Sequence, residues 1–263
     1  MKAKVIKGSG ESYILSDLIK SKYKKQLQRV FNSLFYGKNI KTDFVGKEDS
    51  VIFKELSAKI EKADAYSEEA NVRRANTKWD NIKPFIKHDV NKYLDFGGSD
   101  GDMAVVIGDK LGLDKENIIV MDIEEWAGRK RNPRKEITFV PTSKIHTVRS
   151  NSVDLITCFH VLHHMKHCDA LHAIKEFRRI LKPGGTFILY EHDCYSQQWK
   201  DIVELKHILF DAVINKTTTW EEYDTYSDYR SAKEWKKLIG THFKLSQSKF
   251  VKNNDNSFYT VWQ

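Results

Sequence analysis

The fold of this chain is decided by residues 92–102, which read KYLDFGGSDGD. A mostly apolar run, YLDF, is followed by glycines at positions 97, 98 and 101, and an amphipathic segment then extends from Met103 to Leu111. An apolar run, a glycine-rich break and an amphipathic segment are typical of a strand, a tight turn and a helix in succession. We therefore predict an α/β domain built outward from this strand–turn–helix unit.

The turn has the composition of a nucleotide-type cofactor site. Glycines let a ligand approach the main chain closely, and the start of the next helix offers unpaired backbone N–H groups. A dinucleotide site would carry G-x-G-x-x-G and bind a pyrophosphate, but Asp95, Asp100 and Asp102 crowd this turn and would repel one. Three carboxylates suit a ligand with a positive charge and hydroxyl groups, so we expect S-adenosylmethionine rather than NAD or ATP. In the alternative, the turn only packs the helix on the strand.

Asp122 is the second acidic position that such a ligand would need. It ends the apolar run of residues 117–123, NIIVMDI, about twenty residues beyond the glycine turn. An acidic residue at this spacing can accept both ribose hydroxyls of an adenosine; otherwise it only caps the segment after the strand. Trp126 would lie against the adenine, unless it is an ordinary packing residue.

The rest of the chain alternates between apolar runs and amphipathic segments, as βαβ units do. Residues 182–185, KPGG, are expected to end one helix. The predicted strands are residues 136–143, 153–158, 186–191, 243–251 and 257–262, of which the last two form an antiparallel pair, and the predicted helices are residues 171–181, 199–215 and 232–239, with an insertion at about 216–231.

Residues 1–88 are predicted as a basic helical extension of a main domain that spans residues 89–263. The net charge of +8 permits a polyanionic partner such as RNA, but lysines on a helix often only face water. Shortly before the first strand, Arg73, Asn76 and Lys78 follow one another on a predicted helix. Guanidinium and ammonium groups there suit a cofactor carboxylate and a substrate phosphate, whereas Arg74 is as readily explained by a surface salt bridge.

Composition sets further expectations. Three cysteines without C-x-x-C spacing indicate reduced thiols, and the ten histidines show no recognisable zinc spacing, so we predict no metal site. No apolar run approaches the length of a membrane span, and residues 1–10 lack the apolar stretch of a signal peptide. We therefore expect a cytoplasmic protein without a membrane partner.

Histidines follow the fourth predicted strand, in the run FHVLHHM of residues 159–165. Open α/β sheets bind ligands beyond the carboxyl ends of their strands, which places this run where chemistry would occur. If the acceptor needs a general base, the sequence offers these candidates: His160, His163, His164, Glu191, His192 and Asp193. Each histidine is as readily explained as a hydrogen-bonded packing residue.

The motifs DFGGSDG at 95–101, Asp122, VDLI at 153–156 and LKPGGTF at 181–187 resemble the successive motifs of class I S-adenosylmethionine-dependent methyltransferases, over residues 90–190. The resemblance implies a Rossmann-like, seven-stranded, mostly parallel sheet with an antiparallel last strand. It departs from the family in having Gly98-Ser99-Asp100 for the commoner G-x-G, and Thr142-Ser143 where an Asp often meets the adenine. The cofactor residues that it implies are Lys78, Asp95, Gly97, Gly98, Asp100, Asp122, Ile123, Thr142 and Phe159.

A narrower resemblance is to messenger-RNA cap guanine-N7 methyltransferases, such as the methyltransferase domain of a large DNA virus's capping enzyme. It rests on Arg73-x-x-Asn76-x-Lys78, on His163, and on aromatic residues in the last strand, while His164 departs from the Tyr that is common there. It implies capped RNA as partner, further capping domains in the same polypeptide, and a host-cytoplasmic or virion location. The implied catalytic residues are His163, Glu222 and Tyr259, and the implied substrate residues are Arg73, Asn76, His163, His164 and Tyr226.

Three functions therefore remain open, because a fold alone does not fix a substrate. The first is direct in-line methyl transfer to guanine N7, which is already nucleophilic and needs no general base. The second is methylation of an oxygen or carbon of a small molecule, with a histidine as base. The third is a non-catalytic RNA-binding module, and a protein acceptor would be a further variant of the enzyme.

Overall fold

The computed structural model describes residues 68–86, 89–123, 135–214, 227–251 and 256–263. Residues 1–67 of the basic extension predicted over residues 1–88 and most of the predicted insertion lie outside the described residues, as do Trp126, Glu222 and Tyr226. The domain boundary predicted at residue 88 stays a prediction.

A single seven-stranded sheet forms the centre of the described structure, in the order β3-β2-β1-β4-β5-β7-β6. Strands β1 to β5 pair in parallel, and β7 runs antiparallel to both of its neighbours. This confirms the predicted sheet and its reversed last strand. The strands are β1 (Tyr93–Phe96), β2 (Ile118–Asp122), β3 (Thr138–Pro141), β4 (Val153–Phe159), β5 (Leu181–His192), β6 (Leu245–Phe250) and β7 (Ser257–Trp262).

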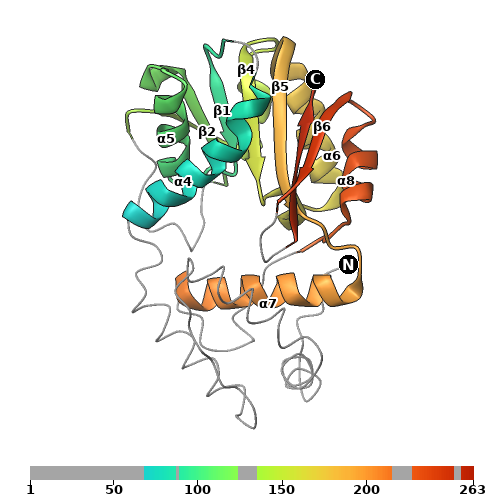
Figure 1. Ribbon diagram of the computed structural model, residues 1–263. Coiled ribbons are helices and arrows are strands. Elements are labelled where there is room, and N and C mark those ends of the chain that lie inside the picture. Colours follow the sequence, from blue (N-terminus) through green and yellow to red (C-terminus); the bar gives the residue numbers. More distant parts are fainter. Residues whose placement is uncertain (1–67, 87–88, 124–134, 215–226, 252–255) are drawn as a thin grey trace.

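Helices cover both faces of this sheet, and one lies across its lower end in Figure 1. Buried residues of α4 and α5 pack on one face, and those of α6 and α8 pack on the other. Helix α7 follows β5 and runs across the end of the sheet. The helices are α4 (Glu68–Ile82), α5 (Asp102–Lys110), α6 (His167–Ile180), α7 (Gln197–Ile214) and α8 (Ala232–Ile239), with 3-10 turns at η1 (Lys83–Phe85), η2 (Lys115–Asn117), η3 (Thr142–Thr147) and η4 (Leu162–His164).

Some predicted boundaries were wrong by a few residues. Strand β3 ends at Pro141, because Thr142 and Ser143 turn into η3. Strand β5 begins at Leu181, since this residue already pairs with Val153, and a register shift follows. Helix α6 begins at His167, four residues earlier than its apolar stripe indicated. Among the described helices, none combines the length and the apolar character that a bilayer-spanning helix needs.

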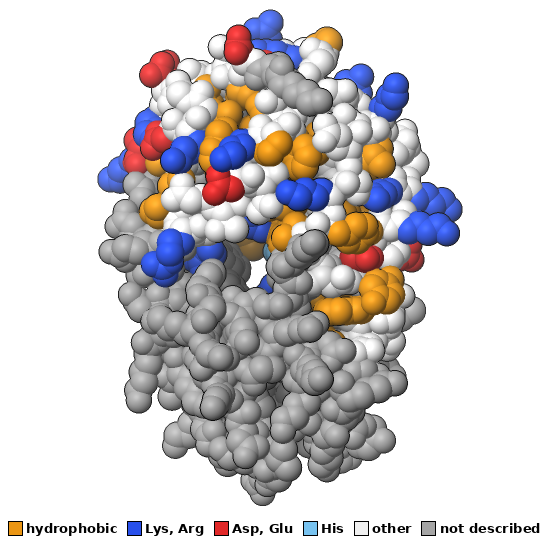
Figure 2. All heavy atoms as spheres, in the orientation of Figure 1, with side chains coloured by type: hydrophobic (Ala, Val, Ile, Leu, Met, Phe, Trp, Pro, Cys, Tyr) orange, Lys and Arg blue, Asp and Glu red, His pale blue; other side chains and the backbone are white. Residues whose placement is uncertain are grey.

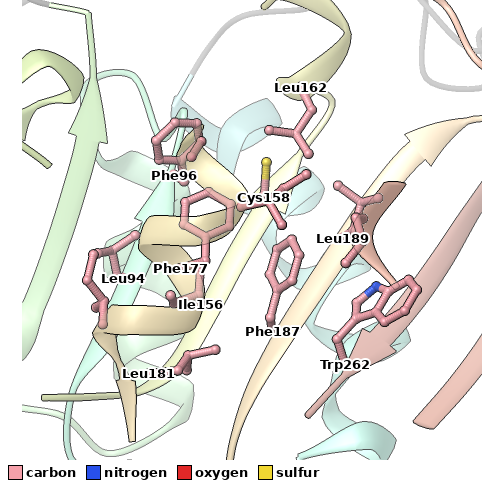
Figure 3. Packing of buried hydrophobic residues seen from close by; sticks show 14 of the residues in the cluster. Leu94, Phe96, Ile156, Cys158, Leu162, Phe177, Leu181, Phe187, Leu189 and Trp262 are labelled. Carbon is pink, nitrogen blue, oxygen red and sulfur yellow. The ribbon is translucent and has the colours of Figure 1, made fainter. Parts of the chain in front are cut away.

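Aromatic packing holds α6 on the sheet, as Figure 3 shows. The ring of Phe177 lies 4.8 Å from that of Phe96 and 5.1 Å from that of Phe187, and all three side chains are buried. Edge-to-face and tilted contacts at these distances favour a fixed arrangement beyond the burial of apolar area. Helix α6 is therefore fixed against β1 and β5, the strands that carry Phe96 and Phe187.

The strand order reverses between β1 and β4, since β2 and β3 lie on one side of this pair and β5 on the other. Open α/β sheets bind ligands at such a point, beyond the carboxyl ends of the strands. The glycine turn that follows β1 and the histidine run that follows β4 both lie there. The fold thus brings the two predicted parts of the site to the same edge.

Candidate active site

The glycine turn brings the end of β1 against β2. Gly97 has φ 78°, a conformation that residues with a Cβ rarely adopt, and its N–H donates to Met121 O at 2.7 Å. A Cβ on Gly97 would lie 2.1 Å from Val161 Cγ2, and one on Gly101 would lie 2.3 Å from Ile137 Cδ1. Close packing of the turn against Val161 and Ile137 therefore requires glycine at these positions, in addition to the approach of a ligand to the main chain.

Asp122 is fixed in orientation at the end of β2. Its Oδ2 accepts a hydrogen bond from Ser99 N at 2.6 Å, and its Oδ1 accepts one from Ile123 N at 2.7 Å. The first of these bonds ties the carboxylate to the glycine turn, as the spacing in the sequence indicated. A carboxylate oxygen has several acceptor positions, so this group is suited to bind hydroxyls such as those of a ribose.

Asp95 is buried at the end of β1, with 3% of its surface exposed. Its Oδ1 accepts a hydrogen bond from Thr157 Oγ1 at 2.6 Å, and the Tyr93 hydroxyl lies 2.7 Å from the same Thr157 oxygen. The pKa of Asp95 is raised from 3.8 to about 7, mainly by burial; the hydrogen bond from Thr157 opposes this rise and the nearby carboxylate of Asp122 contributes to it. A cation placed beside Asp95 would favour the ionised form.

These features fit S-adenosylmethionine, which carries an ammonium, a sulfonium and two ribose hydroxyls. Asp95 would face a positive charge and Asp122 would hold the hydroxyls. Asp100 stays within the turn, where its Oδ1 accepts a hydrogen bond from Asp102 N at 3.3 Å. Of the other predicted contacts, Ile123 is exposed just beyond β2, Thr142 is half-buried just beyond β3, and Phe159 is half-buried at the end of β4.

Lys78 reaches from α4 into a group of aromatic rings at the ends of β4, β5 and β7. Its Nζ lies 3.2 Å from the ring centroid of Tyr190, 5.5 Å from that of Phe159 and 5.9 Å from that of Tyr259. The Tyr259 ring stacks on Tyr190 at 4.3 Å and is 1% exposed. The predicted roles of Lys78 with the cofactor and of Tyr259 in catalysis stay predictions. Arg73 is exposed and Asn76 half-buried on the same helix.

Five histidines form a second group of polar side chains, which we call the histidine cluster: His160, His163, His164, His192 and His207. The first three follow β4, His192 ends β5, and His207 lies on α7. The ring of His160 stacks on that of His192 at 4.1 Å, and the ring of His163 lies 4.1 Å from that of His164 and 4.9 Å from that of His207. The structure thus brings together His160, His163, His164 and His192, which the sequence offered as separate candidate bases; their role as bases stays a prediction.

Carboxylates orient this cluster. Glu191 Oε2 accepts a hydrogen bond from His163 Nδ1 at 2.6 Å, and both side chains are at most 1% exposed. The hydroxyl oxygen of Tyr229 lies 2.5 Å from His207 Nδ1, and the same hydroxyl donates a hydrogen bond to Glu204 Oε2 at 2.7 Å. Burial lowers the pKa values of His160 and His207 well below the usual range, with neighbouring histidines as a further cause. These two rings are therefore neutral near pH 7.

Sequence reasoning missed His207, Glu204 and Tyr229. His207 and Glu204 lie on one predicted helix, with a spacing of three residues that places them on one face. That spacing was the available signal, but nothing in the sequence relates this helix to the histidines after β4. The contact exists because α7 crosses the end of the sheet.

Comparison with known proteins identifies the family to which this chain belongs. A family model described as "Methyltransferase domain" matches residues 53–240, well over half of the chain. The protein is a methyltransferase of this family. The cofactor predicted from the turn and from Asp122, S-adenosylmethionine, is confirmed.

Two curated relatives each match part of the methyltransferase. One is the ubiquinone/menaquinone biosynthesis C-methyltransferase UbiE of Cupriavidus necator, 34% identical over 119 residues that cover 43% of this chain and 46% of that protein. The other is the human thiol S-methyltransferase TMT1A, 29% identical over 89 residues that cover 32% of this chain and 36% of that protein. Less than half the length of either relative is matched.

Solved structures agree with the fold. The PH0226 protein of Pyrococcus horikoshii superposes with a TM-score of 0.57 at 19% identity, covering 76% of this chain and 93% of that one. A SAM-dependent methyltransferase of Archaeoglobus fulgidus gives a TM-score of 0.52 at 10% identity, covering 72% and 93%. At these identities the likeness concerns the fold alone, and the methyl acceptor has to be argued from the site.

Proposed function

We propose that this methyltransferase acts on a small molecule, at an oxygen, sulfur or carbon atom that must lose a proton to become nucleophilic. The observation that carries the proposal is the histidine cluster at the carboxyl ends of β4 and β5. Its rings are packed against one another; the buried carboxylate of Glu191 fixes the orientation of His163, and the half-buried Glu204 acts on His207 through the Tyr229 hydroxyl. Such a group can take a proton from an acceptor, or hold a cation that displaces the proton.

The names of the curated relatives support an acceptor of this kind. UbiE is named as a C-methyltransferase of quinone biosynthesis and TMT1A as a thiol S-methyltransferase. The first name gives carbon and the second gives sulfur as the atom that receives the methyl group. Each relative matches less than half of this chain, so the two names support the class of acceptor rather than its identity.

Methyl transfer to guanine N7 of an RNA cap is the second candidate. It would need no base, so the buried His163–Glu191 pair would have no role in proton transfer. Figure 2 shows lysine and arginine side chains spread over the visible described face, with acidic side chains between them, rather than gathered into one basic surface. The net charge of +8 of the chain is the observation that favours this second candidate.

In the proposed reaction, S-adenosylmethionine supplies an electrophilic methyl group when it is bound. The residues of the chain do the rest. Asp122 would orient the cofactor through its hydroxyls, and Asp95 would favour its positive charge. The histidine cluster would activate the acceptor, and α7, which lies across the end of the sheet, would exclude water from it.

The test is transfer of labelled methyl from S-adenosylmethionine to three acceptor classes: hydroxyquinones and phenols, aliphatic and aromatic thiols, and RNA carrying a GpppA or GpppG cap. We expect label in a phenol, quinone or thiol. His163→Ala should lower that rate by about 10²–10⁴-fold, with cofactor binding by calorimetry unchanged. His172→Ala, an exposed histidine on α6, is the matched control. Label at guanine N7 and in no small acceptor would overturn the proposal.

A further inference from the structure

We propose that His163, His192 and His207 bind a divalent transition-metal ion, with Zn²⁺ as the ion best suited to the site. The inference deepens the proposed function, and rests on it for the role of the ion in activating the acceptor. The binding itself rests only on the arrangement of side chains described below. No metal site was expected from the sequence, because the three ligands come from three separate elements.

The spacing of the nitrogen atoms fits a metal ion. One ring nitrogen from each of the three histidines lies within 4.8 Å of one from each of the others. His163 Nε2 and His207 Nε2 are 3.3 Å apart. Two nitrogen ligands at the Zn–N distance of about 2.0–2.1 Å, separated by a tetrahedral angle, lie about 3.4 Å apart. The closest pair of the site therefore already has the separation that a tetrahedral ion needs.

Hydrogen bonding turns the lone pairs of these two nitrogens toward each other. A carboxylate only accepts, so the bond from His163 Nδ1 to Glu191 Oε2 places the proton on Nδ1 and leaves a lone pair on Nε2. The Tyr229 hydroxyl donates its proton to Glu204, so His207 Nδ1 must donate to Tyr229, and His207 Nε2 also presents a lone pair. Two facing lone pairs require a positive charge between them, which a metal ion or a shared proton supplies.

The surroundings of each ligand favour the metal ion. A metal-bound histidine donates a hydrogen bond from its second ring N–H to a carboxylate, a carbonyl or another oxygen, which fixes the orientation of the ring. Here His163 has Glu191, His207 has Tyr229, and His192 Nδ1 lies 3.3 Å from Ser257 Oγ. Glu191 and Glu204 supply two carboxylates beside the ligands, which balance the charge of a divalent ion. A shared proton would need only one of these partners.

Three protein ligands leave the fourth position of a tetrahedral ion open, as in catalytic rather than structural zinc sites. An acceptor hydroxyl or thiol bound in that position would lose its proton to water, because a bound dication lowers its pKa. The resulting oxygen or sulfur anion is the nucleophile that methyl transfer needs. The ion would also join α7 to the sheet, since His207 comes from α7 and the other two ligands follow β4 and end β5.

The test measures metal binding by the full, untagged chain after treatment with EDTA. We expect one Zn²⁺ per chain by calorimetry, and Co²⁺ to give the strong visible absorption of a tetrahedral site. His207→Ala should abolish the cobalt spectrum and weaken Zn²⁺ binding by more than 100-fold, while His172→Ala leaves both unchanged. Glu191→Gln, which keeps all three ligands, should weaken binding by about 10–100-fold. Circular dichroism of each variant separates loss of the site from loss of the fold.

Absence of Zn²⁺ and Co²⁺ binding by the folded wild-type chain would overturn the inference and leave the shared proton as the explanation. Binding that His207→Ala does not diminish would place the ion elsewhere and overturn it as well. The proposed function fails separately: a chain that binds one Zn²⁺ but methylates only capped RNA keeps the metal site and loses the small acceptor. Methyl transfer to a small acceptor by metal-free protein would keep the proposed function and overturn the role of the ion in activating the acceptor.

Discussion

Replacement of Asp95 by asparagine should make the protein more stable at neutral and alkaline pH. The carboxyl group is 3% exposed, and its pKa in the folded protein is raised to about 7 from an ordinary value of 3.8, mainly because burial disfavours the charge. A raised pKa means that the group contributes its full stability below pH 3.8 and loses it as the pH rises through about 7. Asparagine removes the charge and keeps an oxygen that can accept the hydrogen bond from Thr157.

The magnitude follows from the two pKa values. Their difference corresponds to about 4 kcal/mol at about 1.4 kcal/mol per pH unit. The stability of Asp95→Asn relative to wild type should therefore increase by about 4 kcal/mol between pH 4 and pH 8, and level off above pH 8. Domains of this kind have total stabilities of about 5–15 kcal/mol, so one buried carboxylate would account for a large share.

The assay is urea unfolding at one-unit steps from pH 4 to pH 8, followed by tryptophan fluorescence. Asp114→Asn, which removes an exposed carboxyl group, provides the baseline for the loss of one charge. A stability difference for Asp95→Asn that stays constant within about 1 kcal/mol across this range would refute the reasoning. Calorimetry gives a second measurement: affinity of the wild type for S-adenosylmethionine should fall about tenfold per pH unit below pH 7, and the variant should lack this dependence.

Three further substitutions test other parts of the structure. Gly97→Ala places a Cβ at a positive φ and 2.1 Å from Val161 Cγ2, whereas Gly112→Ala has a similar φ and nothing within 4 Å; urea unfolding should show a loss of about 1–2 kcal/mol for Gly112→Ala and about 2–5 kcal/mol for Gly97→Ala, and equal losses would contradict the packing role. Phe177→Ala empties the contact with Phe96 and Phe187 and should cost about 3–5 kcal/mol in thermal or urea unfolding; a loss below about 1 kcal/mol would show that α6 is held otherwise. Ser231→Ala removes the cap of α8, in which Ser231 Oγ accepts from Glu234 N at 3.2 Å, and should cost about 1 kcal/mol, with Ser231→Thr, which keeps the hydroxyl, close to wild type; equal values for the two variants would argue against the cap.

Much of the fold was predictable because local patterns and tertiary structure agree along this chain. The apolar run of residues 118–122 and the alternation of residues 257–262 became β2 and β7, and the turn residues between 250 and 257 correctly indicated an antiparallel pair. Asp122 was predicted from its spacing as a residue that binds the ribose, and that role stays a prediction, although the structure does place its carboxylate beside the glycine turn. The hydrogen bond from Ser99 N to Asp122 Oδ2 joins the two segments that this spacing separates in the sequence.

The parts of the site that the sequence did not predict depend on contacts between distant elements. His207 meets His163 across 44 residues, and no periodicity in either segment encodes the angle at which α7 crosses the sheet. Lys78 illustrates the same limit: its helix and its charge were predicted, but its position over Tyr190 depends on how α4 packs across β5. Residues 1–67 and residues 216–226 of the predicted insertion, with Glu222 and Tyr226, lie outside the described structure.

The position of β7 in the sheet has a consequence for synthesis of the protein on the ribosome. In the described structure β6 pairs only with β7, and β7 alone joins it to β5. Until residues 257–262 have left the exit tunnel, β6 has no place in the sheet and the edge of β5 stays open to other chains. Ser257, which lies beside His160 and His192, arrives in the same step. A nascent chain therefore pairs the edge of β5 and gains the Ser257 contacts of His160 and His192 in the same step, so the environment of these two rings would report that synthesis has passed this strand.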